Sequence, residues 1–225
     1  MKSKYIKFVF LLFFILVFFP IVSVKASYIP NHAYAQQHNS LTNYGGYFYN
    51  PYGQSSLISN FDSLNNYAFI TNEMWTAFGD SSQWIEVGDV DGNLNGNYWA
   101  GHFTAVQPQD PNKYQEYSIG SNYASSGHSF EIQYLGSFWW GVYVDYQLAI
   151  KFYMPFDYST FTQVGIETNN TAATFSNGIY NANMQYKDLS GTWHNWYSSL
   201  NYDINNLNWT SNYLPNLNRI VYNHN

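Results

Sequence analysis

The sequence has no cysteine and few charged side chains, and both shortages narrow the classes of protein that it fits. Only 10% of its 225 residues are Asp, Glu, Lys or Arg. Without cysteine the chain has no disulfide framework and no thiolate metal site, so its stability has to come from a hydrophobic core. A chain of this length can bury such a core within one domain.

Basic residues are especially scarce. The chain has eight lysines and arginines, and four of them precede residue 27. The other four are set against 14 aspartates and glutamates, which leaves the body of the chain with a charge of −10. Because phosphate backbones repel such a body, we expect no nucleic-acid partner. The low charge does not indicate disorder, since 21% of the residues are aromatic.

Residues 1–26 have the pattern of a secretory signal peptide, in which lysines precede the apolar segment 8–24. Cleavage is expected after Ala26 or after Ala35, and a retained membrane anchor is the alternative. After that segment no apolar run reaches the roughly 20 residues that a membrane helix needs. We therefore expect an extracellular protein that is free of the membrane after cleavage. Its lack of cysteine favours a bacterial or archaeal source.

The body reads as an all-β protein, specifically an antiparallel β-sandwich of the jelly-roll type. Short β-type runs recur every 8–15 residues between turn residues, and no stretch has a helical period. We expect an extended N-terminal arm at 27–60, the sandwich at 61–200, and an Asn-rich tail at 201–225 that could add a final strand. The expected strands are 66–74, 84–88, 97–106, 114–119, 129–135, 139–152, 161–168, 172–175, 181–187 and 193–197.

Two of these runs alternate in the same way. In 84–88, Ile85 and Val87 share one face and Glu86 lies on the other; in 163–167, Glu167 lies opposite two aliphatic residues. Glu86 and Glu167 are two of only five glutamates. If they met in the fold, repulsion would raise the pKa of one carboxyl and so provide an acid and a base.

These runs carry a resemblance to a known family. Residues 84–88 and 163–168 resemble the two catalytic strands of the eqolisin-type glutamic peptidases, and residues 99–108, 127–134 and 172–177 are similar to other strands of that family. The resemblance implies a concanavalin-like β-sandwich with a Gln–Glu pair on its concave sheet. By this resemblance, Glu167 corresponds to the catalytic Glu of the family and Glu86 corresponds to its catalytic Gln. This substitution is a departure, but neprosin-type glutamic peptidases use a Glu–Glu pair. Residues 165–196 also resemble uncharacterised secreted bacterial β proteins.

On this interpretation Glu167 is the general base and Glu86 polarises the scissile carbonyl, with best activity at acidic pH. Trp84 and Gln163 line the groove. The alternative is a non-catalytic module that binds polysaccharide through aromatic rings, with Trp139 and Tyr143 as further ligand-binding residues. A secreted surface protein without a catalytic function is a third. The expected partner is thus an extracellular polypeptide or polysaccharide.

Other chemistry finds less support. The spacing of Asp89, Asp91, Asn93 and Asn95 resembles the start of a calcium loop, but His102 stands where the bidentate Glu belongs, so we expect a solvated turn or at most a looser calcium site. The histidine spacing predicts no zinc site. We expect no metal and no cofactor. A Ser–His–Asp triad stays open, although no Gly-x-Ser-x-Gly elbow occurs.

Overall fold

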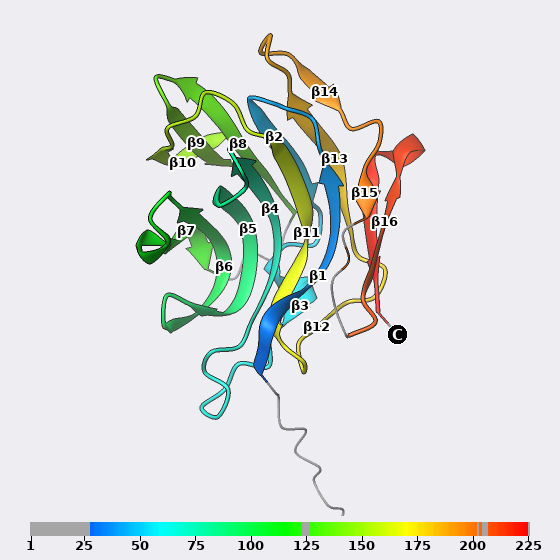
Figure 1. Ribbon diagram of the computed structural model, residues 1–225. Coiled ribbons are helices and arrows are strands. Elements are labelled where there is room, and N and C mark those ends of the chain that lie inside the picture. Colours follow the sequence, from blue (N-terminus) through cyan, green and yellow to red (C-terminus); the bar gives the residue numbers. More distant parts are fainter. Residues whose placement is uncertain (1–27, 123–126, 202, 204–206, 225) are drawn as a thin grey trace, which may run out of the picture.

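Two antiparallel β-sheets packed face to face form the computed structural model, which describes residues 28–122, 127–201, 203 and 207–224 (Figure 1). The predicted all-β sandwich is therefore confirmed. The first sheet has the strand order β15-β1-β11-β4-β5-β6-β7. Its strands are β1 (Tyr28–Asn39), β4 (Phe69–Phe78), β5 (Gln83–Leu94), β6 (Asn97–Gln107), β7 (Gln115–Asn122), β11 (Phe161–Asn170) and β15 (Leu200–Asn201).

The second sheet has the order β10-β9-β8-β2-β13-β17-β16, and β14 also pairs with β13. Its strands are β2 (Gly45–Asn50), β8 (His128–Gly136), β9 (Trp139–Val144), β10 (Gln147–Tyr153), β13 (Tyr180–Lys187), β14 (Trp193–Asn195), β16 (Thr210–Leu214) and β17 (Arg219–Asn223). A small third sheet pairs β3 (Leu57–Ile58) with β12 (Thr174–Phe175). Three short 3-10 turns complete the described structure: η1 (Gln54–Ser56), η2 (Pro111–Lys113) and η3 (Pro215–Leu217).

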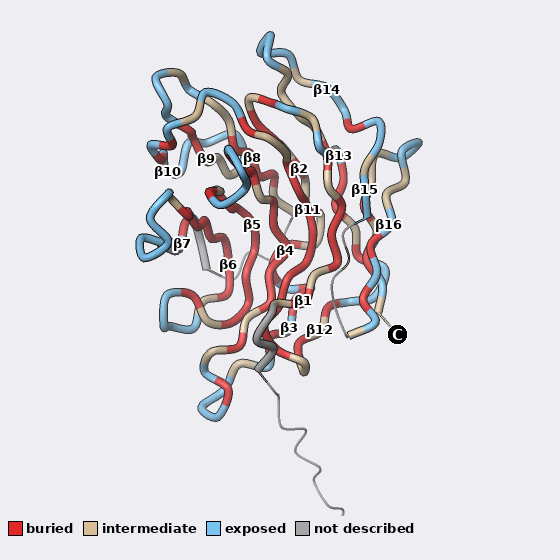
Figure 2. The backbone as a smooth tube through the Cα atoms, in the orientation of Figure 1, coloured by how far each residue is buried: buried red, intermediate tan, exposed pale blue. Residues whose placement is uncertain are grey.

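The core lies between the two main sheets, and the buried backbone is concentrated along β1, β11, β4 and β5 (Figure 2). Phe78 from the first sheet meets Trp140 from the second with ring centroids 4.7 Å apart. Asn72 and Asn181 exchange two hydrogen bonds of 2.6 and 3.0 Å across the same interior. Apolar contact and this amide pair therefore hold the sheets together. No helix in the described residues is long and apolar enough to cross a membrane.

Residues 27–60, expected to form an arm, contribute strands to both sheets. β1 pairs with β11 from Ala33–Thr168 to Asn39–Thr162, and β2 lies between β8 and β13. The sequence signal is weak because the buried face of β1 carries the small residues Ala33 and Ala35 together with Gln37, rather than large aliphatic residues. The tail at 201–225 likewise provides two strands, β16 and β17.

Residues 139–152, expected to be one strand, form the β9–β10 hairpin. Asp145 and Tyr146 turn the chain with φ of 49° and 63°. Two successive residues of positive φ are typical of a type I′ turn, for which Asn-Gly is the usual signal. Asp145 accepts hydrogen bonds from the Ser129 backbone and from the His128 ring, which hold the turn in place.

Candidate active site

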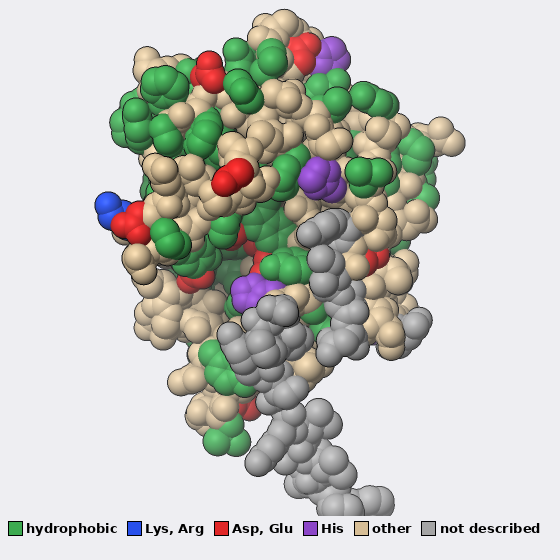
Figure 3. Space-filling view, in the orientation of Figure 1, with side chains coloured by type: hydrophobic (Ala, Val, Ile, Leu, Met, Phe, Trp, Pro, Cys, Tyr) green, Lys and Arg blue, Asp and Glu red, His purple; other side chains and the backbone are tan. Residues whose placement is uncertain are grey.

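A cavity of about 760 Å³ is hollowed into the face of the first sheet that points away from the core. The space-filling view shows this hollow, with carboxylates and apolar side chains on its floor and a histidine at its rim (Figure 3). Strands β1, β11, β4, β5 and β6 all contribute side chains to it. Its lining includes the four glutamates Glu73, Glu86, Glu116 and Glu167.

Three of these glutamates form a diagonal across adjacent strands. Glu167 on β11 lies opposite Thr71 on β4, and Glu86 on β5 lies opposite Trp75 on β4. Glu73 is on β4, two residues from each of those positions. Diagonal neighbours of this kind have Cα atoms about 7–8 Å apart, so long side chains from both flanking strands can reach Glu73. Glu86 and Glu167 therefore line the same cavity from the two strands that flank β4, and the third carboxyl, Glu73, lies on the strand between them.

Glycines make room for the central carboxyl. Glu73 pairs with Gly165 of β11 on one side and with Gly88 of β5 on the other. A Cβ atom at Gly88 would lie 2.6 Å from the Cα of Glu73, and one at Gly165 would lie 2.2 Å from the Cγ of Gln36. Carbon atoms that are not bonded to each other do not approach this closely. A side chain at Gly88 would therefore displace β4, and one at Gly165 would displace Gln36.

Burial and mutual repulsion keep protons on two of the carboxyls. Glu73 is 1% exposed, and its burial, followed by the charges of Glu167 and Glu86, raises its pKa well above 4.5. Burial and then the charge of Glu167 raise the pKa of Glu86 to about 8, against the opposing effect of the Trp75 hydrogen bond. Near neutral pH these two side chains are therefore acids that can donate hydrogen bonds.

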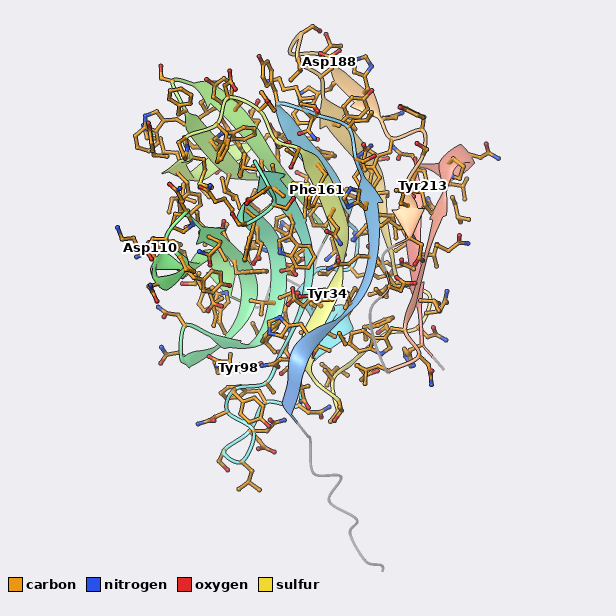
Figure 4. The ribbon with its side chains drawn as sticks, viewed as in Figure 1. Tyr34, Tyr98, Asp110, Phe161, Asp188 and Tyr213 are labelled. Atoms are coloured by element: carbon orange, nitrogen blue, oxygen red, sulfur yellow. The ribbon has the colours of Figure 1, made fainter. Side chains whose placement is uncertain are left out.

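Glu167 has a different set of neighbours, which come from β1. The Nδ1 atom of His32 contacts Oε1 of Glu167 as an ion pair when the ring is protonated. Tyr34, which Figure 4 labels, lies directly opposite Glu167 in the strand register and also forms a side-chain hydrogen bond with it. Burial and the charges of Glu167 and Glu73 raise the pKa of Tyr34, so its hydroxyl stays protonated as a donor. Two side chains of β1 that can donate hydrogen bonds thus lie beside the Glu167 carboxyl.

Two polar atoms in the cavity wall have no hydrogen-bond partner among the described residues. They are the buried atoms Oε1 of Glu73 and Nε2 of Gln36. Trp75, by contrast, donates its Nε1 hydrogen to Oε1 of Glu86 at 2.5 Å. Buried polar atoms are almost always satisfied in native proteins, so the unpaired atoms here are free for a bound molecule or for water.

Apolar side chains close both ends of the cavity. Val90, Leu94 and Phe103 form a small cluster at one end, packed against Phe69. Phe161, labelled in Figure 4, lines the cavity together with Trp75, Ala77 and Trp84. An elongated molecule lying across the carboxyls would thus have a hydrophobic surface on either side.

The structure separates the residues that we predicted for the site into two groups. Glu86, Glu167, Trp84 and Gln163 all line the cavity, where Gln163 donates a hydrogen bond to Gln36. Trp139 and Tyr143 are on β9 of the other sheet and do not line it. Trp139 is 38% exposed there and lies under the Lys151 ammonium at 4.9 Å.

The residues considered for calcium lie along β5 and its end. Asp89 is buried and accepts hydrogen bonds from the His102 ring and from Asn50, both at 2.8 Å. Asp91 accepts from the backbone of Ser59 and from the hydroxyl of Tyr98. In the described part of the chain, no three His, Asp or Glu side chains are grouped as metal ligands.

Sequence reasoning missed Glu73, Trp75, His32 and Tyr34. Glu73 and Trp75 could have been found, because Thr71, Glu73 and Trp75 alternate with Ile70, Asn72 and Met74 as Glu86 does with its neighbours. No local pattern marks the two β1 residues. They reach the site only through pairing with a strand about 135 residues away.

No protein-family model matches this chain, and no curated protein matches it in sequence. Solved structures are similar in fold. Scytalido-glutamic peptidase with a peptide-based transition state analog aligns over 89% of this chain and 100% of its own, with a TM-score of 0.56 and 11% identity. SCP-B, a member of the eqolisin family of peptidases in complex with the tripeptide Ala-Ile-His, covers the same shares with a TM-score of 0.53 and 10% identity. The resemblance inferred from the sequence is therefore confirmed at the level of the fold, which this chain shares with the eqolisin-type glutamic peptidases.

Proposed function

We propose that this protein is a glutamic-type endopeptidase that acts on polypeptides outside the cytoplasm. The observation that carries the proposal is the row of three carboxyls in one open cavity, of which Glu73 and Glu86 hold their protons and Glu167 is surrounded by donors. An acid and a base side by side are what general acid–base hydrolysis requires. The fold shared with known glutamic peptidases supports this reaction class over others.

The proposed reaction needs no group beyond the cavity residues and water. Glu167 accepts a proton from a water molecule as its oxygen bonds to the scissile carbonyl carbon. Protonated Glu86 donates a hydrogen bond to the carbonyl oxygen, where negative charge develops. The C–N bond then breaks, and the proton held by Glu167 passes to the departing amine. Protonated Glu73 lies on the strand between the two and donates a hydrogen bond to the Glu167 carboxylate.

The cavity walls favour an extended peptide as the substrate. A peptide backbone offers alternating N–H and C=O groups, which match the unpaired Glu73 oxygen and the unpaired Gln36 donor. Its side chains would contact the hydrophobic surfaces at either end of the carboxyl row. Since Glu86 keeps its proton up to pH about 8, we expect activity to extend from acidic pH to near neutrality.

Digestion of an unfolded protein substrate between pH 2.5 and 9 tests the proposal. We expect the wild-type protein to cleave it and Glu167→Gln to lose at least 100-fold in rate, because general base catalysis contributes about 10²–10⁴. Glu86→Gln keeps a hydrogen-bond donor and should retain part of the activity. Asp157→Asn, a change at an exposed carboxylate, is the matched control. A folded wild-type protein that cleaves nothing in this range would refute the proposal.

A further inference from the structure

The candidate cavity contains many acids and one base. Four glutamates line it, and His32 is the only described lining residue that can carry a positive charge at neutral pH. Burial, and then repulsion among the carboxyls, raises the pKa of Glu73 and of Glu86, which explains why both stay protonated. Among buried carboxyls, a cation beside one of them favours the ionised form of that carboxyl.

The lysines and arginines of the described chain are all engaged elsewhere. None of them lines the cavity, and each has a partner on another surface. Lys113 is beside Asp110, Lys151 lies over Trp139, Lys187 donates to Gln133, and Arg219 lies over Tyr180.

His32 is positioned to supply that cation to Glu167. Its Nδ1 atom contacts the Glu167 carboxylate, and its ring packs edge-on against Phe69 with centroids 5.2 Å apart and an interplanar angle of 82°. The ring is 38% exposed, so it exchanges protons with solvent. The titratable groups around it are Glu167 of β11, Glu116 of β7 and Tyr34 of β1. No like charge opposes its protonation.

We propose that His32 is a positioning residue that, when protonated, forms an ion pair with Glu167 and holds it as the carboxylate of the row formed with Glu73 and Glu86. This inference rests on the proposed peptidase function and extends it to the pH range in which the site works. The row then contains one ion pair beside two protonated acids. A neighbouring cation favours the ionised form of a carboxyl. We therefore expect the general base to work at lower pH with protonated His32 beside it than without it.

The titration of His32 is consistent with this geometry. Burial alone would lower its pKa, but the hydrogen bond and charge of Glu167, together with the charge of Glu116, outweigh burial and raise it above 6.5. His38, on the same strand, stacks on Phe161 at 4.3 Å and contacts no carboxylate in the described structure. Burial lowers the pKa of His38, which makes it an internal reference.

NMR titration of the histidine rings tests the ion pair without any enzymatic readout. In the wild-type protein we expect the midpoint of His32 to lie above 6.5 and that of His38 below it. In Glu167→Gln the midpoint of His32 should fall by at least one pH unit, while that of His38 stays within about 0.2. An unchanged His32 midpoint in Glu167→Gln would overturn the proposal.

The pH profile of peptide cleavage tests the consequence. His32→Gln should move the acid limb of kcat/KM upward by about one pH unit, since a carboxylate without its cationic neighbour is protonated at higher pH. His32→Lys restores the charge and should return the limb to its wild-type position. His194→Gln, on β14 of the other sheet, is the matched control.

The two experiments separate this inference from the proposed function. If the His32 midpoint depends on Glu167 but the wild-type protein cleaves no peptide at any pH, the ion pair is upheld and the peptidase function is refuted. If the protein cleaves peptides but His32→Gln leaves the acid limb unmoved, the peptidase function stands and the role of His32 is refuted.

Discussion

The buried acid Glu86 leads to a prediction about stability that does not depend on any substrate. Its pKa is about 8 in the folded protein, against 4.5 for the model side chain, which we use for the unfolded chain. Between these values the folded state keeps a proton that the unfolded state releases. The contribution of Glu86 to stability is therefore complete below pH 4.5 and is lost as the pH rises toward 8.

The size of this loss follows from the difference between the two pKa values of Glu86. Each pH unit between the two pKa values costs the folded state about 1.4 kcal/mol, so the whole interval costs about 5 kcal/mol. Glutamine resembles the protonated acid, still accepts the Trp75 hydrogen bond and does not titrate. Glu86→Gln should thus remove the penalty. Its free energy of unfolding, relative to wild type, should rise by about 5 kcal/mol between pH 4.5 and pH 9.

Urea unfolding at pH 4.5, 7 and 9 measures this difference. The change with pH matters more than the value at one pH, because the amide itself alters packing by a constant amount. Asp157→Asn, which removes an exposed carboxylate outside the cavity, is the matched control. A flat difference for Glu86→Gln would show that Glu86 is ionised in the folded protein, and the acid–base assignment of the site would then be wrong.

Three further predictions concern packing and a second buried acid. Gly88→Ala should lower stability by about 1–3 kcal/mol and displace Glu73, because the new methyl group would overlap the backbone of β4. Thermal unfolding and a crystal structure check this, and an unshifted Glu73 would contradict it. Asn181→Ala should lower the free energy of unfolding by about 1–3 kcal/mol, because it leaves the buried Asn72 amide without its partner. In a double-mutant cycle, the double change with Asn72→Ala should cost less than the sum of the single changes, and simple additivity would refute this coupling. Burial raises the pKa of Glu131 to about 7 against the opposing charge of Lys187, so its carboxyl resonance should titrate near pH 7; a midpoint near 4.5 would show that water reaches it.

The sequence predicted the facing of side chains correctly in strands where apolar and polar residues alternate. Ile85 and Val87 are both fully buried, and Glu86 faces the cavity on the opposite side of the strand. The same rule placed Val164 in the core and Glu167 in the cavity. The fold class and the faces of Glu86 and Glu167 could be predicted because side chains two residues apart in a strand point to the same side.

What the sequence did not indicate depends on partners far along the chain. β1 buries small and amide side chains, and the amide of Gln37 is satisfied by Ser211 and Ser199 from the C-terminal region. No local pattern marks such a strand. His32 likewise becomes part of the site only because β1 pairs with β11. Strand order, unlike the facing of residues along one strand, is decided by contacts that a single sequence does not display.

The pairing of β1 with β11 has a consequence for the newly made protein. His32 and Glu167, which contact each other in the cavity, are 135 positions apart in the chain. During synthesis β1 has no hydrogen-bonded partner until residues 161–170 have emerged, and its other neighbour, β15, comes later still. Such long-range closure is slow to form. The contact between His32 and Glu167 can therefore form only after most of the chain has been made.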